Sequence, residues 1–279
     1  MTLSNDLIKN VRQDLIDGEI CSADKDAFYL LVHASGLSLN DVIFDPKKLI
    51  KNIDYDLLKE SISRRKTNEP ISKIIGSKAF WQSSFYVNSH VLDPRPETEF
   101  LVEEVLNRTK KNNSRILDLG TGSGCIAISL ALELSNCDIT GSDVSKDALE
   151  VAEYNNWLNS ANVQFVESDW FEMIDGTFDI IISNPPYLSE EDYNNLSHDI
   201  KFFEPKVALV GASDGLECYR QIVDQLDAYL SDQGVGFFEV GFGQLESVIN
   251  IFSQSGFEVF DKRTDYLGIH RVLCVKKAS

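Results

Sequence analysis

The sequence is short of basic side chains. Lysine and arginine together number 26 against 44 aspartates and glutamates, which gives a formal net charge of -18. Because proteins that bind duplex DNA gain most of their affinity by neutralising phosphates, this balance disfavours nucleic acid as a direct partner.

Histidine is scarce, and the cysteines are not arranged in pairs. The four histidines lie far apart without metal-ligand spacing, so we interpret them as surface or packing residues and predict no metal. The five cysteines include no C-x-x-C pair, which is typical of reduced thiols in a cytoplasmic protein. These residues are His33, His90, His198 and His270, and Cys21, Cys125, Cys137, Cys218 and Cys274.

Long apolar runs, repeats and low-complexity segments are also missing. No apolar run reaches the roughly 18 residues that a membrane span needs, and the N-terminus has no basic-then-apolar signal pattern. We therefore expect a soluble cytoplasmic protein without a membrane partner. Its 279 residues suffice for two domains.

The hydrophobic pattern changes twice along the chain. Residues 1–76 carry apolar side chains at helical spacing and predict a small all-helical domain. Residues 77–93 place two short aromatic runs around the polar turn Gln82-Ser83-Ser84, which predicts a β-hairpin linker. Residues 94–279 alternate apolar strands with helices, which predicts an α/β domain with a parallel sheet. The helical domain either binds a partner, covers a site or only supports packing.

The stretch Asn184-Pro185-Pro186-Tyr187 is the most informative in the chain. It follows residues 178–183, an apolar, β-branched run that predicts a buried parallel strand. Ligands of open α/β sheets bind beyond the carboxyl ends of such strands. The Asn184 side chain and the Pro185 carbonyl can each accept a hydrogen bond, and Tyr187 offers a flat face. This set suits a planar group that carries an NH2, whereas the structural alternative is a strand-terminating turn with an exposed tyrosine.

A glycine turn predicts the nucleotide-binding half of the sheet. The segment Gly120-Thr121-Gly122-Ser123-Gly124 follows an apolar strand, and its glycines allow a ligand to approach the backbone. Asp143 lies about 20 residues further on, where an acidic side chain binds two ribose hydroxyls. Asp169 and Trp170 close the next strand and suit an adenine ring, although plain core packing is the alternative for Trp170.

The glycine turn alone does not identify the cofactor. Residues 122–127 also fit the dinucleotide fingerprint G-x-G-x-x-A, so a nicotinamide dehydrogenase is one alternative. Against it, no acid or base for hydride transfer lies near the strand at 178–183. The last apolar runs, 257–260 and 271–275, are joined without a helix and should pair antiparallel.

Together, these segments resemble the class I S-adenosylmethionine-dependent methyltransferases. The resemblance implies a seven-stranded Rossmann-like sheet with a terminal antiparallel strand pair. It also implies S-adenosylmethionine as cofactor and S-adenosylhomocysteine as product. It places Asp118 and the glycine turn near the methionine end, Asp143 on the ribose, and Asp169 with Trp170 near adenine. The implied cofactor-binding residues are Asp118, Gly120, Thr121, Gly122, Ser123, Gly124, Asp143, Asp169, Trp170 and Asn184.

The Asn-Pro-Pro-Tyr turn resembles the subset of these enzymes that methylates a nitrogen conjugated to a carbonyl or a ring. Further stretches resemble the bacterial-type release factor glutamine N5-methyltransferases, the HemK/PrmC family, in order and spacing from about residue 70 onward. Asp93 and the Trp81-Gln82 turn depart from that family's usual pattern. The matching stretches are Pro94-Arg95-Pro96-Glu97-Thr98-Glu99, Glu204-Pro205 through Ala208-Leu209 to Asp214-Gly215-Leu216 and Tyr219-Arg220, and Glu239-Val240-Gly241 with Gln244.

This second resemblance implies a substrate. It is the side-chain amide N5 of the glutamine in the Gly-Gly-Gln motif of peptide chain release factors, with the helical domain helping to dock the factor. We expect a monomer that uses no metal. The alternatives are an adenine-amino (N6) methyltransferase of RNA or DNA and a nucleotide-binding scaffold without activity. The implied catalytic residues are Asn184, Pro185 and Tyr187, and the implied substrate contacts are Asn184, Pro185, Pro186, Tyr187, Arg95 and Glu97.

Overall fold

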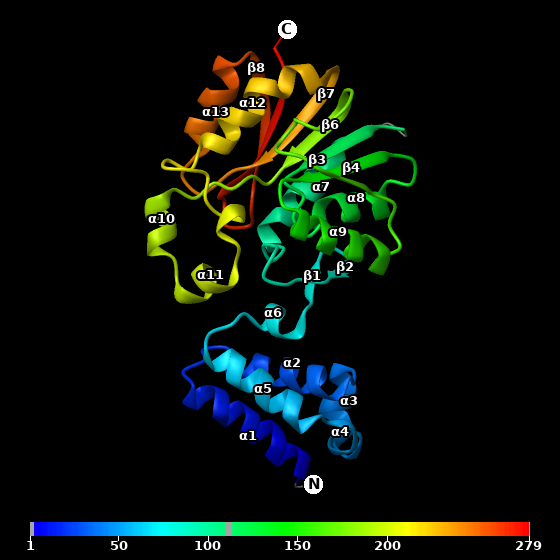
Figure 1. Cartoon of the computed structure of the whole chain (residues 1–279), viewed down its shortest axis with the longest axis vertical. Coiled ribbons are helices and arrows are strands. Elements are labelled where there is room, and N and C mark those ends of the chain that lie inside the picture. Colours follow the sequence, from blue (N-terminus) through cyan, green and yellow to red (C-terminus); the bar gives the residue numbers. More distant parts are fainter. Residues whose placement is uncertain (1–2, 110–112, 279) are drawn as a thin grey trace. The chain divides into compact units, whose positions relative to one another are not determined.

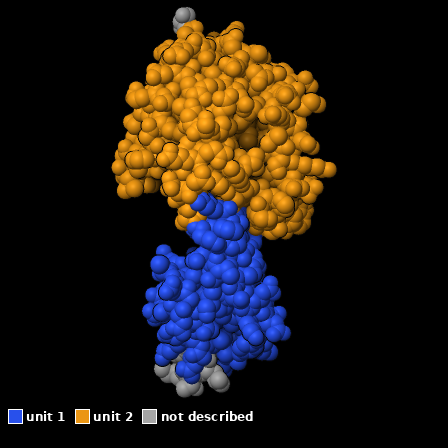
Figure 2. Space-filling view, turned by 60° about the vertical axis from the view of Figure 1, so that its left-hand side comes forward, with its two compact units in different colours: residues 1–77, 198–203 blue, residues 78–197, 204–279 orange. Residues whose placement is uncertain are grey.

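The computed structural model describes residues 3–109 and 113–278 of the chain (Figure 1). It divides into two compact units. The first contains the chain up to residue 77 together with 198–203, and the second contains 78–197 and 204–279 (Figure 2). Within the described ranges, no helix is both long and apolar enough to cross a membrane.

The first unit is helical, as its sequence pattern predicts. Leu15, Leu30, Leu31 and Leu49 are fully buried in its core. Ser38 and Asp41 form a capping box, in which each side chain accepts a hydrogen bond from the other's backbone N–H. Its helices are α1 (Leu3–Asp17), α2 (Ala23–Ser35), α3 (Leu39–Phe44), α4 (Pro46–Asn52), α5 (Tyr55–Lys66), α6 (Ile71–Ile75) and α11 (His198–Phe203).

The second unit contains a seven-stranded sheet with the order β5-β4-β3-β6-β7-β9-β8, which confirms the predicted fold class. Strands β3 to β7 are parallel, and β9 pairs antiparallel with both β7 and β8, as expected for the terminal pair. The strands are β3 (Arg115–Leu119), β4 (Asp138–Asp143), β5 (Gln164–Glu167), β6 (Phe178–Ser183), β7 (Leu230–Glu239), β8 (Phe257–Thr264) and β9 (His270–Lys277).

Helices cover both faces of this sheet (Figure 1). One face packs against α7 (Glu99–Arg108) and α8 (Cys125–Glu133), and the same layer contains α9 (Lys146–Leu158). The other face packs against α12 (Glu217–Tyr229) and α13 (Leu245–Gln254). Alternate residues of β6 point to opposite faces, so Ile180 and Ile182 belong to the first core and Ile181 to the second.

Short elements complete the unit. Strands β1 (Lys78–Phe80) and β2 (Ser83–Phe85) form the expected hairpin. Its turn is Trp81-Gln82 and not Gln82-Ser83-Ser84 as predicted, because both serines pair with β1. The polar segment after Tyr187 contains α10 (Glu190–Asn195) as well as α11. Ser189 caps α10 by accepting a hydrogen bond from the backbone of Asp192. The 3-10 helices are η1 (Pro96–Thr98) and η2 (Lys206–Ala208).

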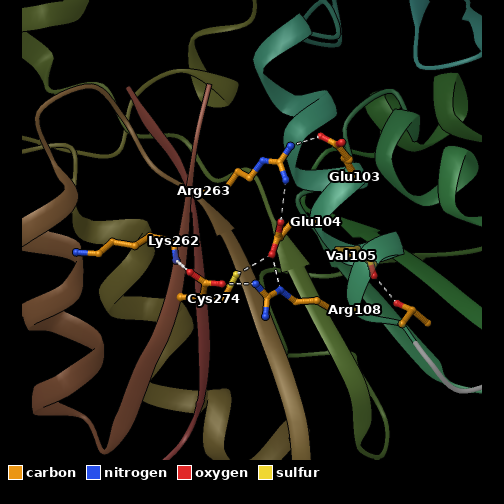
Figure 3. A network of polar contacts seen from close by, with 9 residues as sticks. Glu103, Glu104, Val105, Arg108, Lys262, Arg263 and Cys274 are labelled. Atoms are coloured by element: carbon orange, nitrogen blue, oxygen red, sulfur yellow. Dashed lines mark hydrogen bonds and ion pairs between the residues drawn. The ribbon is translucent and has the colours of Figure 1, made fainter. Parts of the chain in front are cut away.

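A network of ion pairs fixes α7 against the antiparallel edge of the sheet (Figure 3). Arg263 on β8 contacts Glu103 at 2.6 Å and the buried Glu104 at 3.5 Å. Arg108 pairs with Glu104 and with Asp261 on β8. Because α7 directly follows η1, this network also helps to hold η1 near the carboxyl ends of the central strands.

Candidate active site

A cavity of about 340 Å³ lies where β3, β4 and β6 end. It combines the glycine turn, the end of β4, the Asn-Pro-Pro-Tyr turn and parts of residues 90–98 and 207–210. Its volume is in the range of small-molecule sites. Among the residues predicted from the sequence, its lining contains Arg95, Gly120, Thr121, Gly122, Ser123, Asp143, Asp169, Trp170, Asn184 and Pro186.

The glycine turn has two separate requirements for glycine. Gly122 has a φ of 54°, and a Cβ added there would have no atom within 4 Å, so its left-handed backbone alone favours glycine. Gly124 has a φ of 78°, and its Cβ would lie 2.9 Å from Cδ1 of Ile128 and 3.2 Å from Cβ of Ala152. Gly124 therefore allows α8 and α9 to pack closely, and it does not line the cavity.

Asp143 links the end of β4 to the glycine turn. Its Oδ2 accepts a hydrogen bond of 2.9 Å from the Gly122 N–H, and its Oδ1 accepts one of 2.9 Å from the Ser145 N–H. Burial raises the pKa of this carboxyl group above its ordinary value. A carboxylate has about four acceptor positions, so Asp143 can still accept hydrogen bonds from a ligand's hydroxyls.

Asp118 lies beneath the glycine turn and does not line the cavity. It is fully buried, and its Oδ2 accepts a hydrogen bond of 2.6 Å from the Thr121 hydroxyl. Burial raises the pKa of Asp118 to about 7, against the opposing effect of the Thr121 hydrogen bond. The structure thus gives Asp118 a supporting position, with a charge that a nearby cation would stabilise.

Trp170 takes part in core packing and also lines the cavity, so both roles that the sequence left open for it remain compatible with its position. It packs against the core that contains Phe171 and also lines the cavity. Its Nε1 donates a hydrogen bond of 2.8 Å to Oε1 of Gln221, which fixes the ring. A Cβ on Gly120 would lie 4.0 Å from Cζ3 of this ring. Trp170 and the glycine turn therefore form adjoining walls, beside Asp169.

The residues of the Asn-Pro-Pro-Tyr turn have different surroundings. Asn184 and Pro186 line the cavity, whereas Pro185 and Tyr187 do not. Tyr187 packs against the core, and burial raises the pKa of its hydroxyl to about 12. Its carbonyl oxygen accepts a hydrogen bond of 2.8 Å from Nε2 of Gln244.

Asn184 is held by two residues to which sequence reasoning assigned no role. Its Nδ2 donates a hydrogen bond of 3.1 Å to the Thr98 hydroxyl oxygen. That hydroxyl in turn donates one of 2.7 Å to Oε2 of Glu239. Thr98 and Glu239 are both buried, and burial raises the pKa of Glu239 to about 7. For Glu239, the signal that could have found it is the pairing of β6 with β7, which places it beside Asn184.

The two predicted substrate contacts before α7 face different hollows. Arg95 lines the cavity and contacts Oε1 of the buried Glu204 at 2.9 Å. Oε2 of Glu204 accepts a hydrogen bond of 3.2 Å from the Asp93 N–H. Glu97 instead lines a separate hollow of about 410 Å³ with Trp81 and other residues near α7. The structure therefore brings Arg95, but not Glu97, to the cavity.

The cavity fits a nucleoside cofactor with a cationic end. The open backbone at Gly120 and Gly122, the acceptor capacity of Asp143 and the wall formed by Trp170 suit a ring and a ribose. The buried carboxyl group of Asp118 beneath the turn suits a positive group nearby.

Family models match residues 6–76 and 90–204, and relatives align with most of the chain. The model of the methyltransferase small domain matches residues 90–204, and that of the PrmC N-terminal domain matches residues 6–76. The release factor glutamine methyltransferase of Agrobacterium fabrum is 36% identical over 99% of this chain and 98% of its own length. That of Thermodesulfovibrio yellowstonii is 41% identical over 79% of this chain and 81% of its own length.

Solved structures of methyltransferases have a similar fold over much of the chain. A methyltransferase from Pyrococcus furiosus has a TM-score of 0.55 at 19% identity, covering 79% of this chain and 98% of its own. The 16S rRNA N2 G1207 methyltransferase of T. thermophilus, solved with AdoMet and guanosine, has a TM-score of 0.51 at 18% identity. It covers 72% of this chain and 49% of its own.

Proposed function

Because the chain belongs to the release factor glutamine methyltransferase family, we propose that its cavity binds S-adenosylmethionine and presents Asn184 to a release factor glutamine. It is an S-adenosylmethionine-dependent methyltransferase of protein glutamine, acting on N5 of the side-chain amide. The Gly-Gly-Gln motif is the proposed location of that glutamine. The single observation that carries the assignment of Asn184 is its position on the cavity wall at the end of β6.

The glycine turn, Asp143, Asp169 and Trp170 are the proposed cofactor contacts. When bound, S-adenosylmethionine supplies a methyl group on a positively charged sulfur, which makes that methyl group electrophilic. Asp143 is proposed to accept hydrogen bonds from the ribose, and Trp170 to cover the adenine. Asp118 supports the turn through Thr121 and contributes negative charge beneath it.

The substrate amide needs activation because its nitrogen lone pair is delocalised into the carbonyl group. Oδ1 of Asn184 and the carbonyl oxygen of Pro185 are the proposed acceptors for its two hydrogens. They favour the positive charge that develops on this nitrogen and orient its lone pair, and the extra proton is then lost to water. Pro186 and Arg95 complete the cavity wall, and Tyr187, which is partly buried against the core, is proposed to hold the turn.

The helical unit, residues 1–76, is proposed to dock the release factor. Support comes from α3, a helix of six residues on which Leu39, Ile43 and Phe44 are all exposed, because grouped apolar side chains on a surface mark protein-binding sites. If this docking contributes to binding, a short Gly-Gly-Gln peptide should have a higher KM than the intact factor.

The proposal includes a cytoplasmic location, because each of the five cysteines is a free thiol. A monomeric state and metal-free transfer stay predictions. Light scattering tests the first, and assay after treatment with a chelator tests the second.

Methyl transfer from labelled S-adenosylmethionine tests the proposed function. Purified unmethylated release factor and bulk nucleic acid are offered in parallel tubes. We expect label on the factor, and none when the glutamine of its Gly-Gly-Gln motif is changed. Label on the nucleic acid instead would favour an adenine-amino methyltransferase and overturn the proposed substrate.

A further inference from the structure

Asn184 can assist its substrate only if its side-chain oxygen, rather than its nitrogen, faces the cavity. Resting on the proposed function, we propose that Thr98 and Glu239 are positioning residues that impose this orientation on the Asn184 amide. Neither residue needs to touch the glutamine substrate for this effect.

The direction of the hydrogen bonds follows from counting hydrogens. A carboxylate has no hydrogen to donate, so the Thr98 hydroxyl is the donor in its 2.7 Å contact with Glu239. A hydroxyl has a single hydrogen, so Thr98 can act only as an acceptor toward Asn184. The 3.1 Å contact with Thr98 must therefore come from the Asn184 NH2 group.

The oxygen of Asn184 is left available to a ligand. Asn184 lines the cavity, and among the described residues its Oδ1 has no hydrogen-bond partner. In the opposite orientation, the NH2 group of Asn184 would face the NH2 group of the substrate, and two donors would meet. The two ends of an amide are nearly equal in size, so packing alone would not select between these orientations.

The backbone places the three residues together from distant parts of the sequence. Ser183 on β6 is paired with Phe238 on the parallel strand β7. Asn184 directly follows Ser183 and Glu239 directly follows Phe238, so these two residues are neighbours. Thr98 ends η1 and lies above both strand ends. The ion pairs of α7 with β8 hold this segment in place.

Protonation of Glu239 would remove the directional constraint. A protonated carboxyl group can donate its O–H to the Thr98 oxygen, which frees the Thr98 hydrogen for the Asn184 oxygen and reverses the amide. Burial raises the pKa of Glu239 to about 7, so this change would occur near neutral pH. The ionisable groups facing it are Arg271 on β9, Arg95 and Glu97 around η1, Tyr187 after β6, Tyr219 on α12 and Cys125 on α8.

The first test compares Thr98→Val, which removes the hydroxyl but keeps the shape, with Thr98→Ser, which keeps the hydroxyl. We expect Thr98→Val to lower kcat by about 10-fold or more, because a misdirected amide loses its preorganised acceptor. Its affinity for S-adenosylhomocysteine should stay unchanged, and Thr98→Ser should restore most of kcat. Thr109→Val is the matched control, since among the described residues the Thr109 hydroxyl bonds the Val105 carbonyl at the end of α7 and no other group.

The second test uses pH, because a merely structural role would not produce a pH-dependent amide reversal. In the wild type, kcat should fall as pH decreases below about 7, following the raised pKa of Glu239. Glu239→Gln removes the ionisation and supplies an NH2 group that can donate to Thr98, as the protonated carboxyl group does. The kcat of this variant should be lower than that of the wild type, and it should not fall further as pH decreases below about 7.

A readout independent of turnover keeps the test decisive if a variant is unstable. In cofactor-free protein labelled at asparagine, the side-chain amide resonances of Asn184 should shift with a midpoint near pH 7 in the wild type. They should not shift in Glu239→Gln. The positioning role would be overturned if the kcat of Thr98→Val is within twofold of that of the wild type. It would also be overturned if the Asn184 resonances of the wild type do not shift with pH.

Failure of the proposed function would look different. If the wild type transfers methyl groups to nucleic acid and not to release factor, the substrate assignment fails. The same variants can then be assayed on that nucleic acid, because the conjugated NH2 of adenine also requires an acceptor at Asn184. On that nucleic acid, a Thr98→Val variant that matches the wild type would overturn the positioning role, whereas a slower variant would support it.

Discussion

Gln244 donates a hydrogen bond of 2.8 Å from its side-chain Nε2 to the carbonyl oxygen of Tyr187. Gln244 precedes α13, whereas Tyr187 ends the turn after β6, so this contact ties the turn to a segment that follows β7. Gly241 leaves room for the contact: a Cβ there would lie 2.4 Å from Oε1 of Gln244 and 2.9 Å from Cδ2 of Tyr187.

Gly241→Ala should therefore lower kcat, because Gln244 must move away and release the Tyr187 carbonyl. We expect a loss of about 10-fold, from misplacement of the turn that carries Asn184. Gly243→Ala is the control: its φ of 78° strains alanine, but no atom lies within 4 Å of the added Cβ. It should cost about 1 kcal/mol of stability and leave kcat unchanged. Equal kcat values for both variants would contradict the assigned role of Gln244.

Trp170→Leu should weaken the binding of S-adenosylhomocysteine by about 10- to 100-fold, the usual value of one base–aromatic contact. Trp157→Leu is a matched control, because Trp157 is 72% exposed on α9 and does not line the cavity. Titration calorimetry measures both affinities. Equal affinities of the two variants for S-adenosylhomocysteine would mean that Trp170 contributes to core packing alone.

Glu204→Ala should destabilise the cavity wall. The Glu204 side chain is 2% exposed and holds both Arg95 and the Asp93 N–H. Its loss should lower the free energy of unfolding by roughly 2 kcal/mol, less than for a fully buried pair because the Arg95 side chain is 35% exposed. Glu190→Ala, which breaks the half-exposed pair with Lys206, should leave the melting temperature unchanged. Similar unfolding curves for both variants would refute this role.

The stability of the cofactor-free protein should depend on Asp118 between about pH 4 and pH 7. Burial raises its pKa from 3.8 to about 7, so over this window the folded protein retains a proton that the unfolded chain has released. The stabilisation is complete below the unfolded pKa and is lost as pH rises through the folded one. Relative to Asp118→Asn, the free energy of unfolding of the wild type should fall by on the order of 1 kcal/mol for each pH unit that the pH rises across this window. Urea unfolding at several pH values measures the stability of both proteins. The same pH dependence of stability in the wild type and in Asp118→Asn would contradict the prediction.

Several features were predictable because they depend on residues close together in sequence. The apolar runs at 116–119 and 178–183 form adjacent parallel strands, and the terminal pair is antiparallel, as the short connection before residue 271 implies. The family resemblance, drawn from short motifs, is confirmed by relatives that align over most of the chain. Helix α10 was missed because it spans only Glu190–Asn195 and is strongly polar, so no apolar periodicity marks it.

The sequence by itself determined the chemistry at each strand end: glycines after β3, a carboxyl group on the last residue of β4, another after β5, and an amide after β6. Local backbone preferences and apolar periodicity are sufficient for that. Only the tertiary structure decided that Arg95 and Glu97 face different hollows, and that Thr98 and Glu239 orient Asn184. These contacts join residues 86 and 141 positions apart, and they depend on strand register and helix packing, which no local pattern encodes.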